Sequence, residues 1–281
     1  MTFRLGSVDG RATLVHGDAL HDLERCTGGA FGPDPMAAVA EHRRLHEVAA
    51  GLDGRQATGR LSDAILDAPV PRPTNVFAVG LNYRSHAAET GMAHDGMPPA
   101  PLVFTKFPSC ICAPGTDIAL EADSVDWEVE LVVVIGTSGK HIAVADAWDH
   151  VAGLTIGQDI SDRTLQFAAT PPHFDLGKSR DTYGPIGPLL VSVDAFDDPD
   201  DVTLSCEING ERRQHASTTD MIFPVPALIA YLSSILTLQP GDLIFTGTPD
   251  GVGMATGDFL EPGDVITSTI EGIGTFDNRC C

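Results

Sequence analysis

The sequence predicts a mainly β protein with few helices (α+β), in which a small N-terminal domain precedes a larger, rolled sheet domain of mixed or mostly antiparallel strands. Short runs rich in Val and Ile alternate with Gly, Pro and Asp, which is typical of strands joined by turns. Few segments have the length and pattern of helices. The strands also do not alternate regularly with helices, which disfavours a doubly wound parallel sheet.

A proline-rich segment divides the chain into two unequal parts. Residues 66–74 (LDAPVPRPT) carry three prolines and resemble a linker. We therefore expect a small N-terminal domain at residues 1–70 and a larger main domain at residues 71–281.

Two elements are predicted in the N-terminal part. Alternation around Asp9 and Gly10 predicts a β-hairpin, because this dipeptide favours a tight turn. Residues 35–50 (PMAAVAEHRRLHEVAA) predict an amphipathic helix that begins at Pro35 and stops at Gly51.

The second part is dominated by short apolar runs, each of which predicts a strand. These runs span residues 76–81, 102–104, 129–135, 188–193, 202–208, 243–245 and 265–270. Two helices are predicted there, a short one at residues 144–150 and a longer one at residues 226–236 (PALIAYLSSIL).

Charge and composition exclude several classes of function. The 281 residues include 39 acidic and 17 Lys or Arg side chains, giving a net charge of −22. A nucleic-acid-binding protein needs a basic surface, which this composition lacks, and the same charge disfavours an anionic membrane. No apolar stretch is long enough to span a bilayer. An acidic substrate would therefore be attracted by a local metal or a few basic groups.

The six cysteines indicate a reducing compartment. None forms a C-x-x-C pair, and no Cys and His cluster has the spacing of a zinc site. The first residues lack the apolar run of a secretory signal. We expect reduced thiols and a cytoplasmic protein.

A first candidate site lies in the segment DWEVE at residues 126–130. In a strand, Glu128 and Glu130 point to one face together with Asp126, while Val129 points to the other. Neighbouring carboxylates repel each other unless a cation such as Mg²⁺, Mn²⁺ or Ca²⁺ lies between them. The alternative is that these acids form a solvated outer face of the sheet.

A second candidate lies in the segment GQDISDRTLQ at residues 157–166. Asp159 follows an apolar strand at residues 154–156 and could complete a metal site of three carboxylates. Arg163 and Gln166 offer hydrogen-bond donors to an anionic or carbonyl substrate. The alternative is a polar turn that caps a short helix.

A histidine and a glutamate three residues apart form a third candidate. On a helix, His86 and Glu89 share a face and can form a hydrogen bond, which makes His86 a candidate general base. The alternative is an ordinary surface pair. Two other catalytic motifs are absent, because H-x-x-E-H fails at Thr90 and no G-x-S-x-G occurs.

Two further segments carry candidate residues. Lys178, in the segment LGKSRD, could add positive charge beside the metal, or could lie in an ordinary turn. Residues 246–253 (TGTPDGVG) resemble a nucleotide-binding loop in composition only, because no βαβ unit follows. We expect the amides of this loop and the Thr248 hydroxyl to hold a substrate carboxylate.

Six of these segments together resemble the fumarylacetoacetate hydrolase family, in the branch of bacterial acylpyruvases and 2-hydroxyhepta-2,4-diene-1,7-dioate isomerases. The matching segments occur in the order of the family and cover nearly all of the chain from residue 75. They are VGLNYRSHAAE, FTKFPSCICAPG, DWEVELVVVIG, GQDISDRTLQ, GKSRDTYGPIGP and QPGDLIFTGTPDGVG.

The resemblance implies a rolled β fold, a homodimer and a Mg²⁺ or Mn²⁺ cofactor. It assigns Glu128, Glu130 and Asp159 to the metal, and it does not make Asp126 a direct ligand. It makes His86 and Glu89 a water-activating pair, with Lys178 at the metal site. It also implies that Arg163, Gln166 and Thr248 contact the substrate.

The activity implied is hydrolysis of a C–C bond in a small acylpyruvate through a metal-stabilised enolate. The same enolate serves oxaloacetate decarboxylation and hydroxydienedioate isomerisation, so both remain alternatives. A non-catalytic, acidic metal-binding protein is the alternative from another class. Substrate selection is expected in loops at residues 91–101 and 168–174, which contain His94 and His173.

Overall fold

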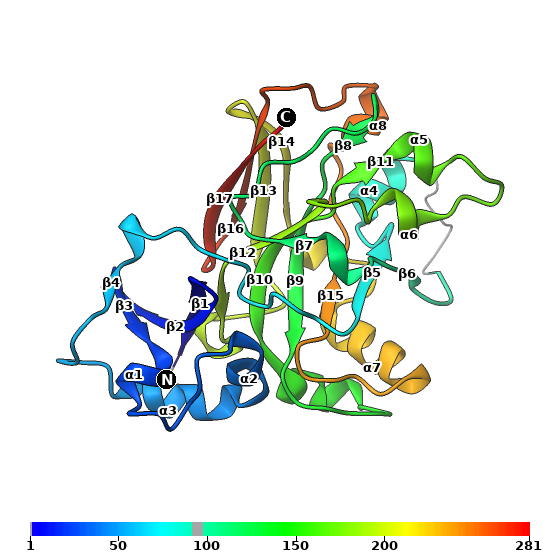
Figure 1. The fold of residues 1–281 in the computed structure, drawn as a ribbon. Coiled ribbons are helices and arrows are strands. Elements are labelled where there is room, and N and C mark those ends of the chain that lie inside the picture. The colour runs from blue at the N-terminus through cyan, green and yellow to red at the C-terminus, as the bar shows by residue number, and fades with distance from the viewer. Residues whose placement is uncertain (1, 92–97) are drawn as a thin grey trace.

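The computed structural model describes residues 2–91 and 98–281 and confirms a mainly β fold (Figure 1). The strands are β1 (Arg4–Val8), β2 (Arg11–His16), β3 (Ala19–Asp22), β4 (Gly59–Arg60), β5 (Val76–Gly80), β6 (Leu102–Thr105), β7 (Ile111–Cys112), β8 (Val125–Asp126), β9 (Val129–Ile135), β10 (Val151–Gln158), β11 (Ser161–Asp162), β12 (Gly184–Val191), β13 (Thr203–Ile208), β14 (Glu211–Ser217), β15 (Leu243–Phe245), β16 (Val265–Ile270) and β17 (Gly274–Arg279). The α-helices are α1 (Leu23–Cys26), α2 (Pro35–Ala40), α3 (His42–Ala50), α4 (Arg84–Glu89), α5 (Arg163–Gln166), α6 (Phe174–Gly177), α7 (Val225–Ile235) and α8 (Gly253–Thr256).

Most strands lie in one large mixed sheet with the order β4-β3-β2-β1-β12-β10-β9-β15-β5-β6, and β7 pairs with β12. A second sheet has the order β14-β13-β16-β17, and β8 pairs with β11. Within the described residues, β5 with β15 and β7 with β12 are the parallel pairs, and the other strand pairs are antiparallel. The mostly antiparallel sheet predicted from the sequence is therefore confirmed.

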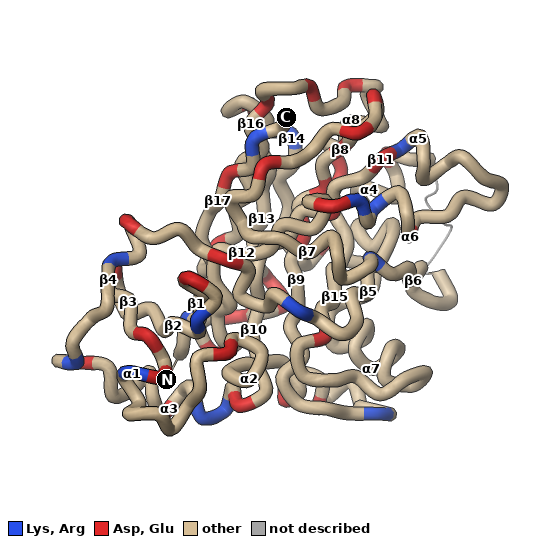
Figure 2. Tube along the Cα trace, in the orientation of Figure 1, with Lys and Arg blue, Asp and Glu red and all other residues tan. Residues whose placement is uncertain are grey.

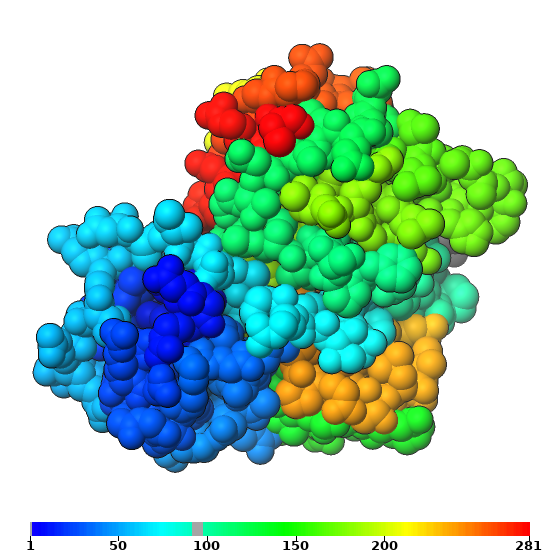
Figure 3. Space-filling view, viewed as in Figure 1, coloured from blue at the N-terminus to red at the C-terminus, as the bar shows by residue number. Residues whose placement is uncertain are grey.

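The N-terminal strands extend the large sheet. The predicted hairpin forms between β1 and β2, and its turn uses left-handed backbone at Asp9 (φ 52°) and Gly10 (φ 71°). Strand β1 then pairs with β12, and Leu14 belongs to the same buried cluster as Val132. Figure 3 shows the N-terminal segment, in blue, packed against the rest of the molecule. The domain boundary at residue 70 remains a prediction.

The expected helix at residues 35–50 is interrupted at Glu41, which has non-helical dihedral angles (φ −106°, ψ 22°) and separates α2 from α3. The ring of His42 is buried so closely against Gly136 that a Cβ atom there would lie 2.5 Å from its Nδ1. The contact between His42 and Gly136 joins residues that are far apart in the sequence, so the sequence pattern could not predict it. The segment Val144–His150 is a 3-10 helix, and α7 confirms the other predicted helix.

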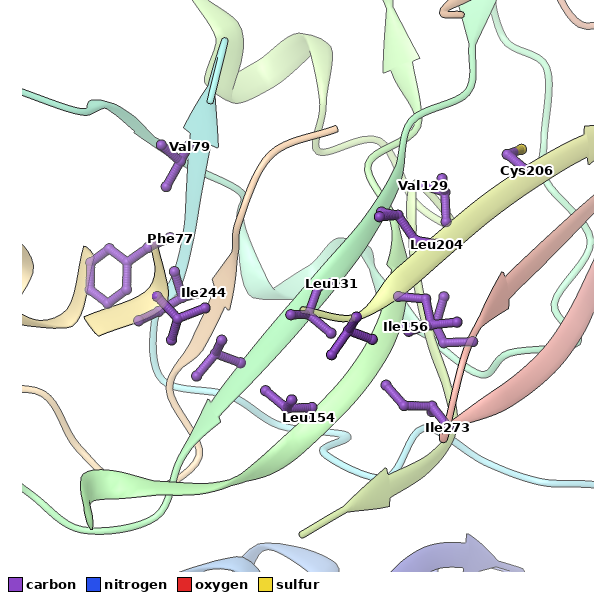
Figure 4. Close-up of a cluster of buried hydrophobic side chains, with 14 of the residues drawn as sticks. Phe77, Val79, Val129, Leu131, Leu154, Ile156, Leu204, Cys206, Ile244 and Ile273 are labelled. Carbon is purple, nitrogen blue, oxygen red and sulfur yellow. The ribbon is translucent and has the colours of Figure 1, made fainter. Parts of the chain in front are cut away.

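Strand β9 lies at the centre of the large sheet and is buried along its whole length. Val129 and Leu131 point into one core with Leu154, Ile156 and Leu204 (Figure 4). Val132 and Val134, on the same strand, belong to a second core. Polar side chains at the ends of such a strand are therefore held by rigid, fully packed structure.

Helices α4, α5, α6 and α8 gather at one end of the sheet (Figure 1). Acidic positions are spread over both parts of the chain (Figure 2). Among the described residues, no helix combines the length and the apolar character needed to cross a bilayer.

Candidate active site

Three carboxylates meet at the end of the two central strands. Glu128 and Glu130 lie at the start of β9, and Asp159 follows the last residue of β10. The antiparallel register places Gln158 opposite Val129, and the amide of Asp159 donates to the carbonyl of Glu128 at 2.9 Å. One ligand oxygen from each carboxylate lies within 4.8 Å of the others, and all three residues are buried. The structure thus brings together the three acids that the sequence singled out.

Two predicted basic residues pair with these acids. Lys178 Nζ donates to Glu128 Oε2 at 2.8 Å, to Asp159 Oδ2 at 2.7 Å and to Ser161 Oγ at 2.8 Å. Arg163 Nη2 donates to Glu128 Oε1 at 2.6 Å. These cations lower the pKa of Glu128 below its ordinary value, although burial opposes the charged form. Glu128 is therefore ionised and oriented from two sides.

Lys106 is a site residue that the sequence analysis left without a role. Its side chain is fully buried, and Nζ donates to Asp159 Oδ1 at 2.7 Å, to the Tyr183 carbonyl at 3.0 Å and to the Lys178 carbonyl. Burial opposes its charge, but the nearby Asp159 carboxylate outweighs this effect and raises the pKa of Lys106. The available sequence sign was a rare lysine inside an apolar run, LVFTKF.

Glu130 is the carboxylate that lacks a basic partner among the described residues. Its Oε2 accepts a hydrogen bond from the Gly247 amide at 2.8 Å. Burial, together with the charges of Asp159 and Glu128, raises its pKa well above the ordinary value. A hard divalent cation would relieve this repulsion and prefers carboxylate oxygens, so the donor set fits Mg²⁺ or Mn²⁺.

The predicted histidine pair forms on α4. His86 is buried, and its Nδ1 lies 3.1 Å from Glu89 Oε2. The Glu89 carboxylate can accept a hydrogen bond from Nδ1–H, and in that tautomer Nε2 carries the lone pair that can take up a proton. The other oxygen, Glu89 Oε1, accepts from the Gly251 amide at 2.9 Å. Glu89 therefore links the imidazole to the glycine loop at residues 246–253.

Three amides of the glycine loop bind acids of the protein itself, a role that the sequence did not predict for them. They were expected to hold a substrate carboxylate, but the amides of Gly247 and Gly251 donate to Glu130 and Glu89. The Gly253 amide donates to Asp126 Oδ1 at 2.7 Å. Tertiary contacts across the chain take up these donors, which local sequence cannot reveal. The loop holds acids of the protein itself.

Asp126 is also accounted for by contacts within the protein. Its Oδ2 accepts from the Met254 amide at 2.9 Å and from Arg163 Nε at 2.8 Å. It does not belong to the carboxylate group around Glu130 that could hold a cation. This placement agrees with the expectation that Asp126 is not a direct metal ligand.

Most of the candidate catalytic and substrate-binding residues line one pocket with a cavity volume of about 40 Å³. Its polar lining is His86, Thr90, Glu128, Arg163, Gln166, Lys178 and Thr248, and its remaining lining is Val79, Gly80, Leu81, Phe104, Phe167, Phe174 and Met254. Glu89, Glu130 and Asp159 are not part of this lining, but Glu89 contacts His86 and Asp159 contacts Lys178, which are. Residues 92–97, which include His94, lie outside the described residues.

Two predicted substrate contacts are also held by neighbouring side chains. The Thr248 hydroxyl donates to the Val129 carbonyl at 2.9 Å and accepts from Gln214 Nε2 at 2.8 Å. Gln166 Oε1 accepts from Arg163 Nη1 at 2.9 Å. Both side chains are therefore fixed in the pocket wall before any substrate binds.

Several known proteins are similar to this chain in sequence and fold. Residues 75–280 match the family model for the fumarylacetoacetate (FAA) hydrolase C-terminal domain. The human oxaloacetate tautomerase FAHD2A, a mitochondrial protein, is 42% identical over 272 residues, which cover 92% of this chain and 86% of the relative.

Two solved structures are also similar. A Mycobacterium smegmatis protein given the name HpcE has a TM-score of 0.92 and 47% identity, and the match covers 99% of this chain and 98% of that one. Maleylpyruvate hydrolase from Sphingobium sp. SYK-6, solved with manganese(II) and pyruvate, has a TM-score of 0.82 and 30% identity over 99% and 98% of the two chains. The chain belongs to the fumarylacetoacetate hydrolase family.

Proposed function

We propose that the chain catalyses proton transfer at C3 of a small 2-oxo acid, so that its keto and enol forms interconvert. The observation that carries this proposal is the position of His86, which Glu89 holds at 3.1 Å in the wall of a pocket shared with Lys178. The human relative, named an oxaloacetate tautomerase, supports this reaction type at 42% identity.

The side chains divide the reaction between them. His86 Nε2 accepts the C3 proton of the keto form, and the imidazolium then delivers a proton to the enolate oxygen to give the enol. In the reverse direction the hydroxyl proton is taken up and C3 is protonated, and in both directions Glu89 stabilises the imidazolium. Lys178 provides positive charge in the same pocket, where the enolate oxygen develops negative charge. A divalent cation held by Glu128, Glu130 and Asp159 would supply Lewis-acid stabilisation of that oxygen. Arg163, with its planar donors, orients Glu128 and borders the substrate.

Charge balance in the cluster favours an anionic substrate once a cation is bound. The carboxylates of Asp126, Glu128, Glu130 and Asp159 face three cations, Lys106, Arg163 and Lys178. The group therefore carries one negative charge in excess when all members are ionised. A divalent cation would reverse this sign, and a 2-oxo acid would then meet net positive charge.

Hydrolysis of an acylpyruvate is the second candidate, and the similarity to maleylpyruvate hydrolase favours it. In that reaction His86 would deprotonate a water molecule that attacks the distal carbonyl, and pyruvate would leave as its enolate. Oxaloacetate decarboxylation forms the same enolate without a base. Dependence on His86 therefore separates decarboxylation from the other two reactions.

The test follows the ultraviolet absorbance of enol-oxaloacetate in a stopped-flow instrument with Mn²⁺, with parallel assays of acylpyruvate cleavage and CO₂ release. We expect faster enol decay, and His86→Asn and Glu89→Gln should each lower kcat by about 10²- to 10⁴-fold. His16→Asn is the matched control, because His16 is exposed on β2 and is not part of the described pocket lining. Mn²⁺ binding without any turnover would instead establish the non-catalytic alternative.

A further inference from the structure

Three phenylalanine rings form a row that begins beside Lys178. Lys178 Nζ lies 5.4 Å from the centroid of the Phe104 ring. The Phe104 and Phe174 rings meet edge to face at 5.4 Å, and the Phe174 and Phe167 rings meet edge to face at 6.3 Å. All three rings line the pocket, and Phe167 is 41% exposed. The row, named here the phenylalanine wall, therefore runs from the carboxylate cluster toward solvent.

Other side chains extend this apolar surface. Val79, Leu81 and Met254 also line the pocket. Met254 is unbranched and adapts to groups of different shape. A substrate whose head lies at Lys178 would thus have its distal substituent against aromatic and aliphatic carbon.

The described lining offers no free cation to that substituent. Its basic side chains are His86, Arg163 and Lys178. His86 faces Glu89, Arg163 pairs with Asp126 and Glu128, and Lys178 pairs with Glu128 and Asp159. A second substrate carboxylate along the phenylalanine wall would lose hydration without gaining a basic partner from the described lining.

We infer that this site prefers 2-oxo acids whose C3 substituent is apolar, such as an aryl or alkyl group, over those that carry a carboxylate there. This inference rests on the proposed function for the reaction and adds the class of substrate. An apolar substituent gains from burial against the phenylalanine wall, and a phenyl ring can continue its edge-to-face packing. The preference follows from the side chains of this chain and not from the name of its human relative.

Phenylpyruvate and oxaloacetate form a matched pair of probes, because they share the 2-oxo acid head and differ in a phenyl or a carboxylate at C3. The experiment measures kcat/KM for both enols with Mn²⁺. We expect phenylpyruvate to be preferred by about 10-fold or more, and Phe174→Ala to remove about 10-fold of its kcat/KM with a much smaller effect on oxaloacetate.

A second variant reverses the chemistry of the wall. Phe174→Arg should raise kcat/KM for oxaloacetate relative to phenylpyruvate, because it places a cation beside the distal carboxylate. Leu176→Arg is the control for added charge, since Leu176 lies on the same helix α6, is 61% exposed and does not line the pocket. This control should keep the preference of the unmodified protein.

The outcomes separate the inference from the proposed function. If both enols react but oxaloacetate is preferred, or if Phe174→Ala lowers both values equally, the inference is wrong and the proposed function stands. If neither enol reacts, the proposed function fails. In that case, calorimetry in the same Mn²⁺ buffer measures the dissociation constants of both compounds and decides the inference. Phenylpyruvate must bind more tightly than oxaloacetate to the unmodified protein, and it must lose this advantage in the Phe174→Ala variant.

Discussion

At the scale of single residues, Lys106 is expected to contribute strongly to stability. It is fully buried, and its ammonium group lies 2.7 Å from Asp159 Oδ1. Lys106→Met would leave that carboxylate buried without this partner, so we expect the free energy of unfolding to fall by about 3–5 kcal/mol. Urea denaturation measures the change. Lys140→Met is the control at an exposed lysine and should change the midpoint little; equal stability of the two variants would contradict the structural role given to Lys106.

The raised pKa of Glu130 predicts how the affinity of the site for a metal ion depends on pH. Burial and the charges of Asp159 and Glu128 raise its pKa, so its carboxyl retains a proton at pH values where a free glutamate is ionised. A cation must displace that proton. We expect Mn²⁺ affinity to increase with pH up to this pKa and to level off above it. Calorimetry in buffers of different ionisation enthalpy should detect proton release, and Glu130→Gln should abolish it.

The sequence predicted some of these residues and missed others for a physical reason. Periodicity suggested that Glu128 and Glu130 share a face, and the family resemblance assigned Asp159 to the same metal site; in the structure Glu128 precedes β9, Glu130 lies in it and Asp159 follows β10. Lys106 is 53 residues from Asp159 in sequence, and an ion pair of that span leaves no periodic trace. Its buried position became evident only from the folded chain.

At the scale of elements, the glycine loop at residues 246–253 connects the separate parts of the site. Its amides donate to Glu130 in the carboxylate cluster, to Glu89 on α4 and to Asp126 on β8. From the local sequence we expected these amides to hold one kind of anion, a substrate carboxylate. The anions are side chains from distant segments, which could be identified only after the fold had brought them to the loop.

Gly251 offers a direct test of this connection. Its φ is +94°, and an added Cβ atom would lie 1.9 Å from the Arg213 carbonyl oxygen. We expect Gly251→Ala to displace the amide that holds Glu89, and so to lower both kcat and the melting temperature. Gly263→Ala is the matched control, because Gly263 has φ +99° with open space around it. The control should show only the backbone cost of about 1–2 kcal/mol and no loss of kcat.

For the whole molecule, strand order was the least predictable feature. The apolar runs predicted where most strands of the second part lie, including β9 at residues 129–135. They did not predict that β1 pairs with β12, because Leu5 and Leu190 are close only in the folded chain. Apolar pattern specifies which face of a strand is buried, but the partner of each strand depends on packing between distant segments.

This architecture predicts that metal binding stabilises the entire fold. The candidate ligands lie at the ends of β9 and β10, the central strands of the large sheet, so local opening of the site would disturb both cores. At 100 times its dissociation constant, Mn²⁺ should raise the free energy of unfolding by about 2.7 kcal/mol. Urea denaturation with and without MnCl₂ measures this increase.

General screening of the net charge of −22 could also stabilise the protein, so NaCl at equal ionic strength is the reference condition. Glu130→Gln should lose most of the Mn²⁺-specific increase, because it removes one ligand from the central cluster. Asp197→Asn removes an exposed acid far in sequence from the cluster and should keep it. If NaCl reproduced the full effect, or if both variants responded alike, the carboxylate cluster would not be the site at which the cation stabilises the fold.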